Sequence, residues 1–146
     1  MQFDWYILGT ILSGLFSSFF GCLVLIHNRN KMGVIFFAFS LSFSLWTLPY
    51  AIWLAQHEPI PALFWSRMLM LGATLLPIFY LHWITIILKL ETRHRILLLV
   101  GYISTIFYAV FCFSTLYIDK VVHVGNFPFW PHANLLFTIF LFTLLL

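Results

Sequence analysis

The sequence predicts an all-α fold, a polytopic bundle of about five transmembrane helices in which the fifth is cut short. Of the 146 residues, 63% are hydrophobic and only 8% are charged, whereas soluble domains carry roughly 25% charged residues. The apolar residues gather in five runs, and most basic residues gather in two short loops between them. We therefore expect one transmembrane region over residues 1–146.

Four of the runs are long enough to cross a bilayer, because each reaches the ~20 residues that a helix needs to span ~30 Å of hydrocarbon. The fifth run, residues 134–146, would give a helix of only ~20 Å at 1.5 Å per residue. We expect that this helix is incomplete at Leu146. The four complete spans are predicted at residues 6–26, 32–55, 63–90 and 96–117.

Small residues predict how the first two helices pack. In lipid, helices associate by close backbone approach over Gly, Ala, Ser and Thr. The first helix has two ridges of such residues, and the second has one line of them. These residues are Gly9, Ser13, Ser17 and Gly21 on one ridge, Gly14, Ser18 and Cys22 on the next, and Ser40, Ser44, Thr47, Ala51 and Ala55 in the second helix.

In the second helix, Trp46, Tyr50 and Trp53 share one face. Two interpretations remain open. The three rings can form an aromatic belt at the outer interface, or they can form one wall of an outward-facing pocket. Pro49 lies in the same stretch and should kink the helix, because it removes one backbone hydrogen bond.

The third run keeps Arg67, Pro77 and His82. Arg67 lies near the outer end, where it can extend toward water and Glu58, or bind an anion at a pocket mouth. Pro77 should bend the helix. His82 needs a hydrogen-bond partner inside the membrane, and it is either a neutral structural residue or a proton-sensitive one.

The segment 118–133 is unusually rich in Phe, Trp and Pro for a loop, so we expect it to lie on the bundle or in the headgroup layer, where it can cover a pocket. Metal-ligand side chains occur on this side, but their spacing matches no known motif. No metal site, cofactor, disulfide or catalytic residue is predicted. The side chains in question are His57, Glu58, His123 and His132, and the two cysteines are Cys22 and Cys112.

The basic residues predict the orientation. Five of the seven lie in the loops between helices one and two and between helices three and four, and basic loops stay in the cytoplasm. The N-terminus is then outside. The net charge of +3 is explained by this topology, so no nucleic acid is predicted as a partner. The five residues are Arg29, Lys31, Lys89, Arg93 and Arg95.

The stretches NRNKMGVIFFAFSLSFSLWTLPYAIWLA and PALFWSRMLMLGATLLPIFYLHWITIILKL resemble the N-terminal seven-transmembrane region of bacterial sensor histidine kinases. FPFWPHANLLF resembles the outer loop and fifth helix of some members. The chain departs from the family in having about five spans and no phosphoacceptor helix or ATP-binding domain. The matching positions are Leu45-Trp46, Tyr50-Ala51, Phe64 to Arg67, Gly72-Ala73, Pro77 and His82.

The resemblance implies the input region of a two-component histidine kinase, in the bacterial inner membrane, which biases a cytoplasmic kinase core. The chain itself is then no enzyme. Its partners would be the bilayer, an unknown small-molecule or lipid signal, and a second copy in a homodimer of the full-length protein. The ligand-binding candidates are Trp46, Tyr50, Arg67 and His82. The alternatives are a fragment of a transporter or membrane-embedded enzyme, or a stand-alone small membrane protein.

Overall fold

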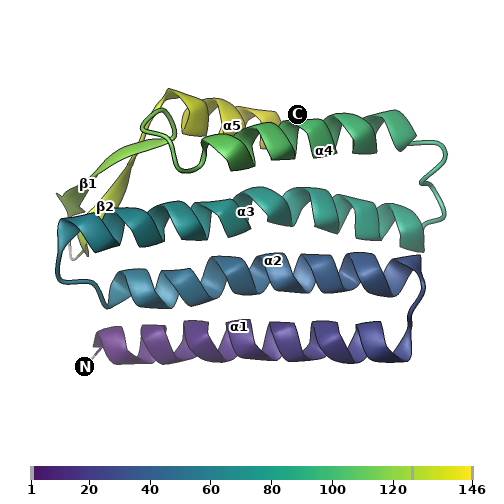
Figure 1. Ribbon diagram of the computed structural model, residues 1–146, viewed down its shortest axis with the longest axis horizontal. Helices are drawn as coiled ribbons and strands as arrows, with labels where there is room; N and C mark the ends of the chain where they lie inside the picture. Colours follow the sequence, from purple (N-terminus) through teal and green to yellow (C-terminus); the bar gives the residue numbers. More distant parts are fainter. Residues whose placement is uncertain (1, 126, 146) are drawn as a thin grey trace.

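The computed structural model describes residues 2–125 and 127–145. It contains five helices and one two-stranded antiparallel sheet (Figure 1). The predicted all-α class is confirmed, and the small sheet is an addition that the sequence did not reveal. The elements are α1 (Gln2–His27), α2 (Lys31–Leu54), α3 (Pro59–Ile87), α4 (Arg95–Phe111), β1 (Ile118–Val124), β2 (Phe127–Ala133) and α5 (Leu135–Leu145).

Three helices are long and apolar enough to cross a membrane, namely Trp5–His27 within α1, all of α2 and all of α3. Most of their residues are not buried inside the protein, although they are apolar. A surface of this kind is stable against lipid and not against water. The length and composition of these helices therefore mark the chain as a membrane protein.

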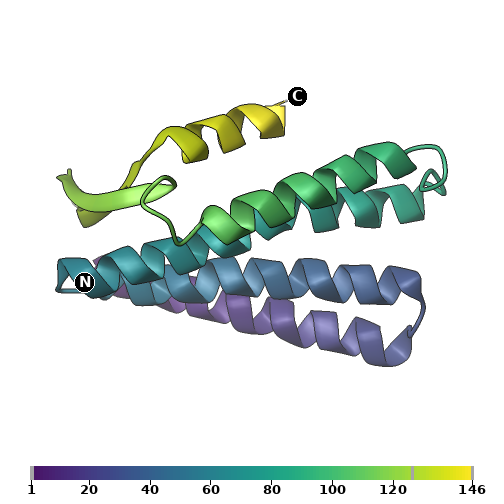
Figure 2. The ribbon, with the colours of Figure 1, turned by 45° about the horizontal axis from the view of Figure 1, so that its top comes forward.

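The helices follow one another up and down, with α2 between α1 and α3, and with α4 packed on α3 (Figures 1 and 2). Two loops, 28–30 and 88–94, lie together at one end of the bundle, which we call the basic end. The α2–α3 loop and the β-hairpin lie at the other end, the hairpin end (Figure 1).

The small residues pack α1 against α2 as predicted. Ser44 donates a hydrogen bond to the carbonyl of Gly14 at 2.8 Å, and Ser18 donates to the Ser44 hydroxyl at 2.7 Å. A side chain at Gly14 would overlap Thr47, at 2.7 Å. Gly9, in contrast, has no neighbour within 4 Å, so only the middle and the basic-end half of the small-residue ridges carry this contact.

The fourth helix is shorter than the predicted 96–117. It ends at Phe111 and has 17 residues, because the chain then turns inward to bury Cys112 and Tyr117, both 0% exposed. The Tyr117 hydroxyl lies 3.2 Å from Thr74 Oγ1 on α3, and Cys112 Sγ lies 3.5 Å from the same atom. This contact replaces the last one and a half turns of the expected helix.

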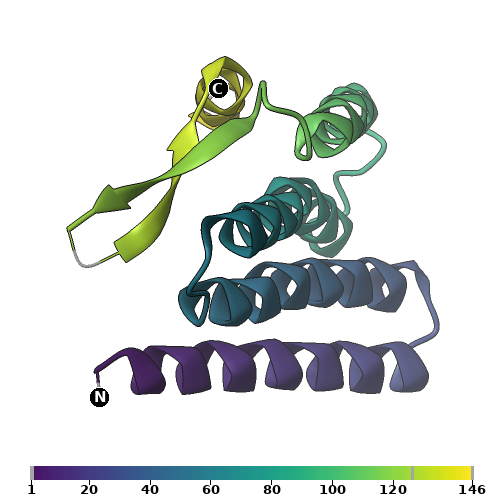
Figure 3. The same cartoon turned by 60° about the vertical axis from the view of Figure 1, so that its left-hand side comes forward.

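The segment predicted as an apolar cover is a β-hairpin that turns at Gly125, where φ is +56°. It projects along one side of the hairpin end (Figure 3). Pro128 and Pro131 lie in β2, which is an edge strand and therefore tolerates residues without an N–H group. α5 follows directly and packs Phe140 on Tyr108, with ring centroids 5.2 Å apart. Leu146, the predicted end of this helix, lies outside the described residues.

Candidate functional site

Arg67 holds the hairpin from α3. Its guanidinium donates from Nη2 and Nε to the main-chain carbonyl of Ile118, at 2.7 and 3.3 Å. Ile118 is the first residue of β1 and is 1% exposed, so this carbonyl has no access to water. A cation inside an apolar helix thus satisfies a buried backbone acceptor. Within the described residues, Arg67 makes no ion pair with Glu58, the partner that the sequence suggested.

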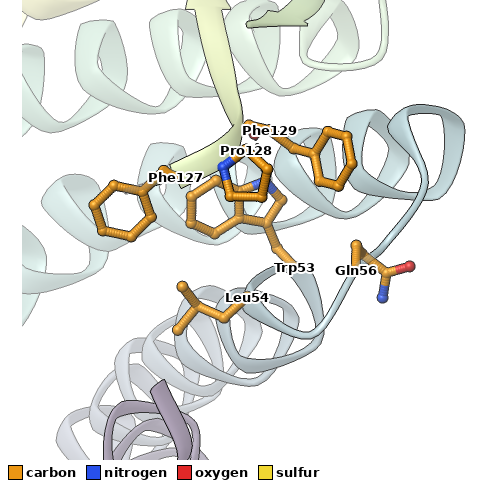
Figure 4. A pocket seen from close by; sticks show the side chains of 6 residues that line it. All are labelled: Trp53, Leu54, Gln56, Phe127, Pro128 and Phe129. Atoms are coloured by element: carbon orange, nitrogen blue, oxygen red, sulfur yellow. Dashed lines mark hydrogen bonds between the residues drawn. The ribbon is translucent and has the colours of Figure 1, made fainter. Parts of the chain in front are cut away.

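Trp53 holds the hairpin from α2. Its indole N–H donates to the carbonyl of Phe129 at 3.0 Å, and its ring lies nearly parallel to that of Phe127, with centroids 6.0 Å apart. Pro128 lies over the indole (Figure 4). The space left there is only about 10 Å³, which is at the lower limit for one water molecule. These residues form a packed contact with no room for a ligand.

The two other aromatic candidates do not meet around a common cavity. Tyr50 stacks on Trp53 with a centroid distance of 5.5 Å, so it supports the hairpin contact. Trp46 is 39% exposed and touches Phe43 edge-on. The backbone of Trp46 is in close contact with Gly72 of α3. Tyr50 therefore supports the hairpin contact, whereas the Trp46 side chain lies at the outer surface.

His82 lies near the opposite end of α3 and has two polar partners. Its Nδ1 lies 2.7 Å from the Tyr102 hydroxyl on α4, and its Nε2 lies 3.1 Å from a Glu91 carboxylate oxygen. The His82 side chain is only 12% exposed. A neutral imidazole with its proton on Nε2 satisfies both contacts, since Tyr102 can donate and Glu91 can accept.

Glu91 extends this chain of contacts to α2. Its carboxylate also pairs with the ammonium of Lys31, the first residue of α2. The hydrogen bond from Lys31, and then the one from His82, hold the pKa of Glu91 below its usual 4.5 despite partial loss of hydration. The carboxylate therefore stays ionised in any neutral solution and joins three elements: α2, α3 and the α3–α4 loop.

Three of the four predicted residues thus lie at two separate places, and Trp46 belongs to neither. Arg67 is part of a hairpin clasp, made of Arg67, Trp53 and the strand atoms that they bind, and Tyr50 stacks on Trp53 of this clasp. His82 belongs to a basic-end chain of Lys31, Glu91, His82 and Tyr102. The two groups are separated by 15 positions on one continuous helix, or roughly 22 Å at 1.5 Å per residue.

The sequence did not predict Glu91, Tyr102 and Lys31 as members of the chain that includes His82. A residue nine positions after His82 would lie on the opposite face of a continuous helix, about half a turn away. The backbone reverses at Lys89, where φ is +55°, and this reversal returns Glu91 to His82. A glutamate immediately after the apolar run was the only available signal.

Within the described part of the chain, no group of three or more His, Cys, Asp and Glu side chains is placed to hold a metal ion. His132 instead pairs with Asp119 across the hairpin at 2.9 Å, and both cysteines are free thiols. The two polar groups on α3 therefore bind protein atoms, and they fix the hairpin, the α3–α4 loop and α4 to this helix.

Comparison with known proteins gave no match to a family model, to a curated protein or to a solved structure. A function is therefore inferred from the contacts at the two ends of α3.

Proposed function

We propose that this chain is the membrane-embedded signal-input region of a bacterial sensor histidine kinase. It would lie in the inner membrane with the N-terminus outside and bias a cytoplasmic kinase core, within a homodimer of the full-length protein. No kinase chemistry is assigned to any residue of this chain. The motifs that resemble the family's seven-helix region support the proposal, and so does one structural observation.

That observation is the double attachment of α3. At the hairpin end, Arg67 binds the buried carbonyl of Ile118, and at the basic end His82 binds Glu91 and Tyr102. No loop lies between these positions, because α3 is continuous from Pro59 to Ile87. Any movement of the hairpin that shifts Arg67 is therefore carried along α3 to the contacts at the basic end.

The proposed mechanism is a shift between two arrangements of the bundle. A small-molecule or lipid signal would favour one position of the hairpin clasp over another, and it can shift the equilibrium only by its difference in affinity for the two. In the proposed orientation, the basic-end chain reports this position on the cytoplasmic side. The clasp and the polar chain are both needed for the signal, whereas neither is needed for insertion of the helices into the membrane.

Chromosomal variants in the native host test the proposal. Deleting the gene should change the transcripts of a defined set of genes, and Arg67→Ala should change the same set. Losing hydrogen bonds from a charged donor, worth ~1.5–3 kcal/mol, shifts a two-state equilibrium by about tenfold or more. Arg67→Lys keeps a cationic donor and should lie between Arg67→Ala and the wild type.

Arg93→Ala is the matched control, because Arg93 forms no ion pair in the described part of the chain. Immunoblots of membranes should show equal amounts of all variants. A deletion that abolishes uptake of a solute and leaves transcripts unchanged would favour the transporter alternative. A deletion with neither effect would favour a stand-alone membrane protein, and either result would overturn the proposal.

A further inference from the structure

A cavity of about 640 Å³ lies between α3, α4 and α5, beside the middle of α3. Its size is within the range of small-molecule sites, ~300–1,000 Å³. Leu97 and Val100, which line it, are 51% and 54% exposed, so it opens on the apolar outer surface of the bundle. A molecule dissolved in lipid can therefore enter from the side.

Three hydroxyl groups in the lining have no hydrogen-bond partner among the described residues. They belong to Ser104, Thr105 and Tyr108, which lie on α4 and line the cavity. Among the side chains described, no fully buried polar atom lacks a partner, so these hydroxyls reach the open space of the cavity. In a membrane, an unpaired hydroxyl beside hydrocarbon has a free-energy cost that a bound acceptor would remove.

Hydroxyl groups elsewhere in the long helices commonly satisfy themselves. Thr74 donates to the carbonyl of Met70 at 2.8 Å, Thr47 to that of Phe43 at 3.1 Å, and Ser42 to that of Ala38 at 2.8 Å. Such bonds to the preceding turn are the usual arrangement for Ser and Thr in a membrane helix. Two neighbouring residues on α4 that do not form them, together with Tyr108, set this wall of the cavity apart.

The lining also limits the charge of a ligand. Among the described residues, no Asp, Glu, Lys, Arg or His lines the cavity, so a carboxylate or an ammonium would have no counter-ion there. Pro77, on the opposite wall, cannot donate to the carbonyl of Ala73, which adds an acceptor near the cavity. The lining matches a molecule that is mostly hydrocarbon, uncharged, and equipped with oxygen atoms.

We infer that this cavity binds a neutral lipid-soluble molecule whose carbonyl or hydroxyl oxygen accepts hydrogen bonds from Ser104, Thr105 and Tyr108. Isoprenoid quinones and long-chain alcohols share this chemistry. The inference does not depend on the proposed signalling role, because binding is measured without any output.

Photolabelling of the full chain in phosphatidylcholine vesicles tests the inference. The probe is a long-chain alcohol that carries a diazirine, and the comparison probe is the fatty acid of the same length, ionised at neutral pH. The alcohol should label peptides of α3 and α4 that line the cavity, and unlabelled alcohol should compete. The double variant Ser104→Ala/Thr105→Val should lower this labelling by about tenfold, the effect of losing two hydrogen bonds.

The matched control is Thr10→Val/Ser13→Ala on α1, which removes the same groups where they bond only to their own helix. It should label like the wild type. Both double variants should keep Cys112, 0% exposed in the wild type, unreactive toward a thiol reagent, which shows that they fold. Equal labelling by alcohol and acid, labelling that does not saturate, or labelling unchanged in Ser104→Ala/Thr105→Val would overturn the inference.

Discussion

Glu91 holds the basic end of the bundle together at the scale of single residues. Its carboxylate accepts from Lys31 and from His82, and these bonds lower its pKa below 4.5. A group whose pKa is lower in the folded state adds stability above its unfolded pKa, and this stability is lost as the pH falls through the folded pKa. The Glu91 contacts should therefore stabilise the protein at neutral pH and cease to do so in acid.

Glu91→Gln should lower the thermal unfolding midpoint in detergent at about pH 6, and the difference from wild type should shrink as the pH falls below 4.5, through the lowered pKa of Glu91. The Gln side chain can still accept one hydrogen bond, so the loss is that of the charge. Circular dichroism at 222 nm follows unfolding at every pH. At neutral pH, labelling of Cys112 by a thiol-reactive dye, in a Cys22→Ser background, also reports unfolding because Cys112 is fully buried. A difference that does not change between neutral pH and the lowest pH at which the protein stays folded would show that the charge of Glu91 has no part in stability.

Some of the residues that form these contacts could be predicted from the sequence, and others could not. Arg67 and His82 could be singled out, because a polar side chain in an apolar run must find a partner. Their partners could not be foreseen. Arg67 binds a main-chain carbonyl, which any residue possesses, and Glu91 meets His82 only because the backbone reverses between them.

At the scale of elements, α2 and α3 are in close backbone contact where Gly72 meets the preceding helix. A Cβ at Gly72 would lie 2.4 Å from the Trp46 amide nitrogen and 2.6 Å from the Leu45 carbonyl carbon. Main-chain atoms cannot move aside as a flexible side chain can, so α2 and α3 would have to separate. Overpacking of this kind costs ~1–3 kcal/mol.

Gly72→Ala should therefore lower the free energy of unfolding by about 1–3 kcal/mol, measured from the same Cys112 labelling. Gly9→Ala is the control, because nothing lies within 4 Å of its Cβ position, and Ala has the higher helix propensity. It should be neutral or slightly stabilising. Equal effects of the two substitutions would mean that the close approach at Gly72 does not contribute to stability.

The helices were foreseeable from their apolar length, and the hairpin was not. Prolines in FPFWPHA argue against a strand in general, and only the edge position of β2 makes them acceptable. The end of α4 at Phe111 could not be predicted from the sequence for a related reason. The residues after it are as apolar as those before, and burial of Tyr117 against Thr74 is a tertiary effect.

At the scale of the whole molecule, the cations of the basic end fall into two groups. Lys31 is paired with Glu91, but Arg29, Lys89, Arg93 and Arg95 form no ion pair within the described residues. These four cations are therefore available to hold the basic end in the cytoplasm, the orientation that the proposed function requires. The pairing also allows topology and folding to be separated by mutation, because the four can be removed while the Lys31–Glu91 contact stays.

Reporter insertions test this orientation. Alkaline phosphatase, active only outside the cytoplasm, should be active when inserted after His57, in the α2–α3 loop, and inactive after Thr92, in the α3–α4 loop. Replacing Arg29, Lys89, Arg93 and Arg95 by Gln should give activity at both positions, since the charge difference that selects one orientation is lost. Activity only after Thr92 in the wild type would reverse the orientation, place the hairpin clasp on the cytoplasmic side, and so exclude an external signal acting on it.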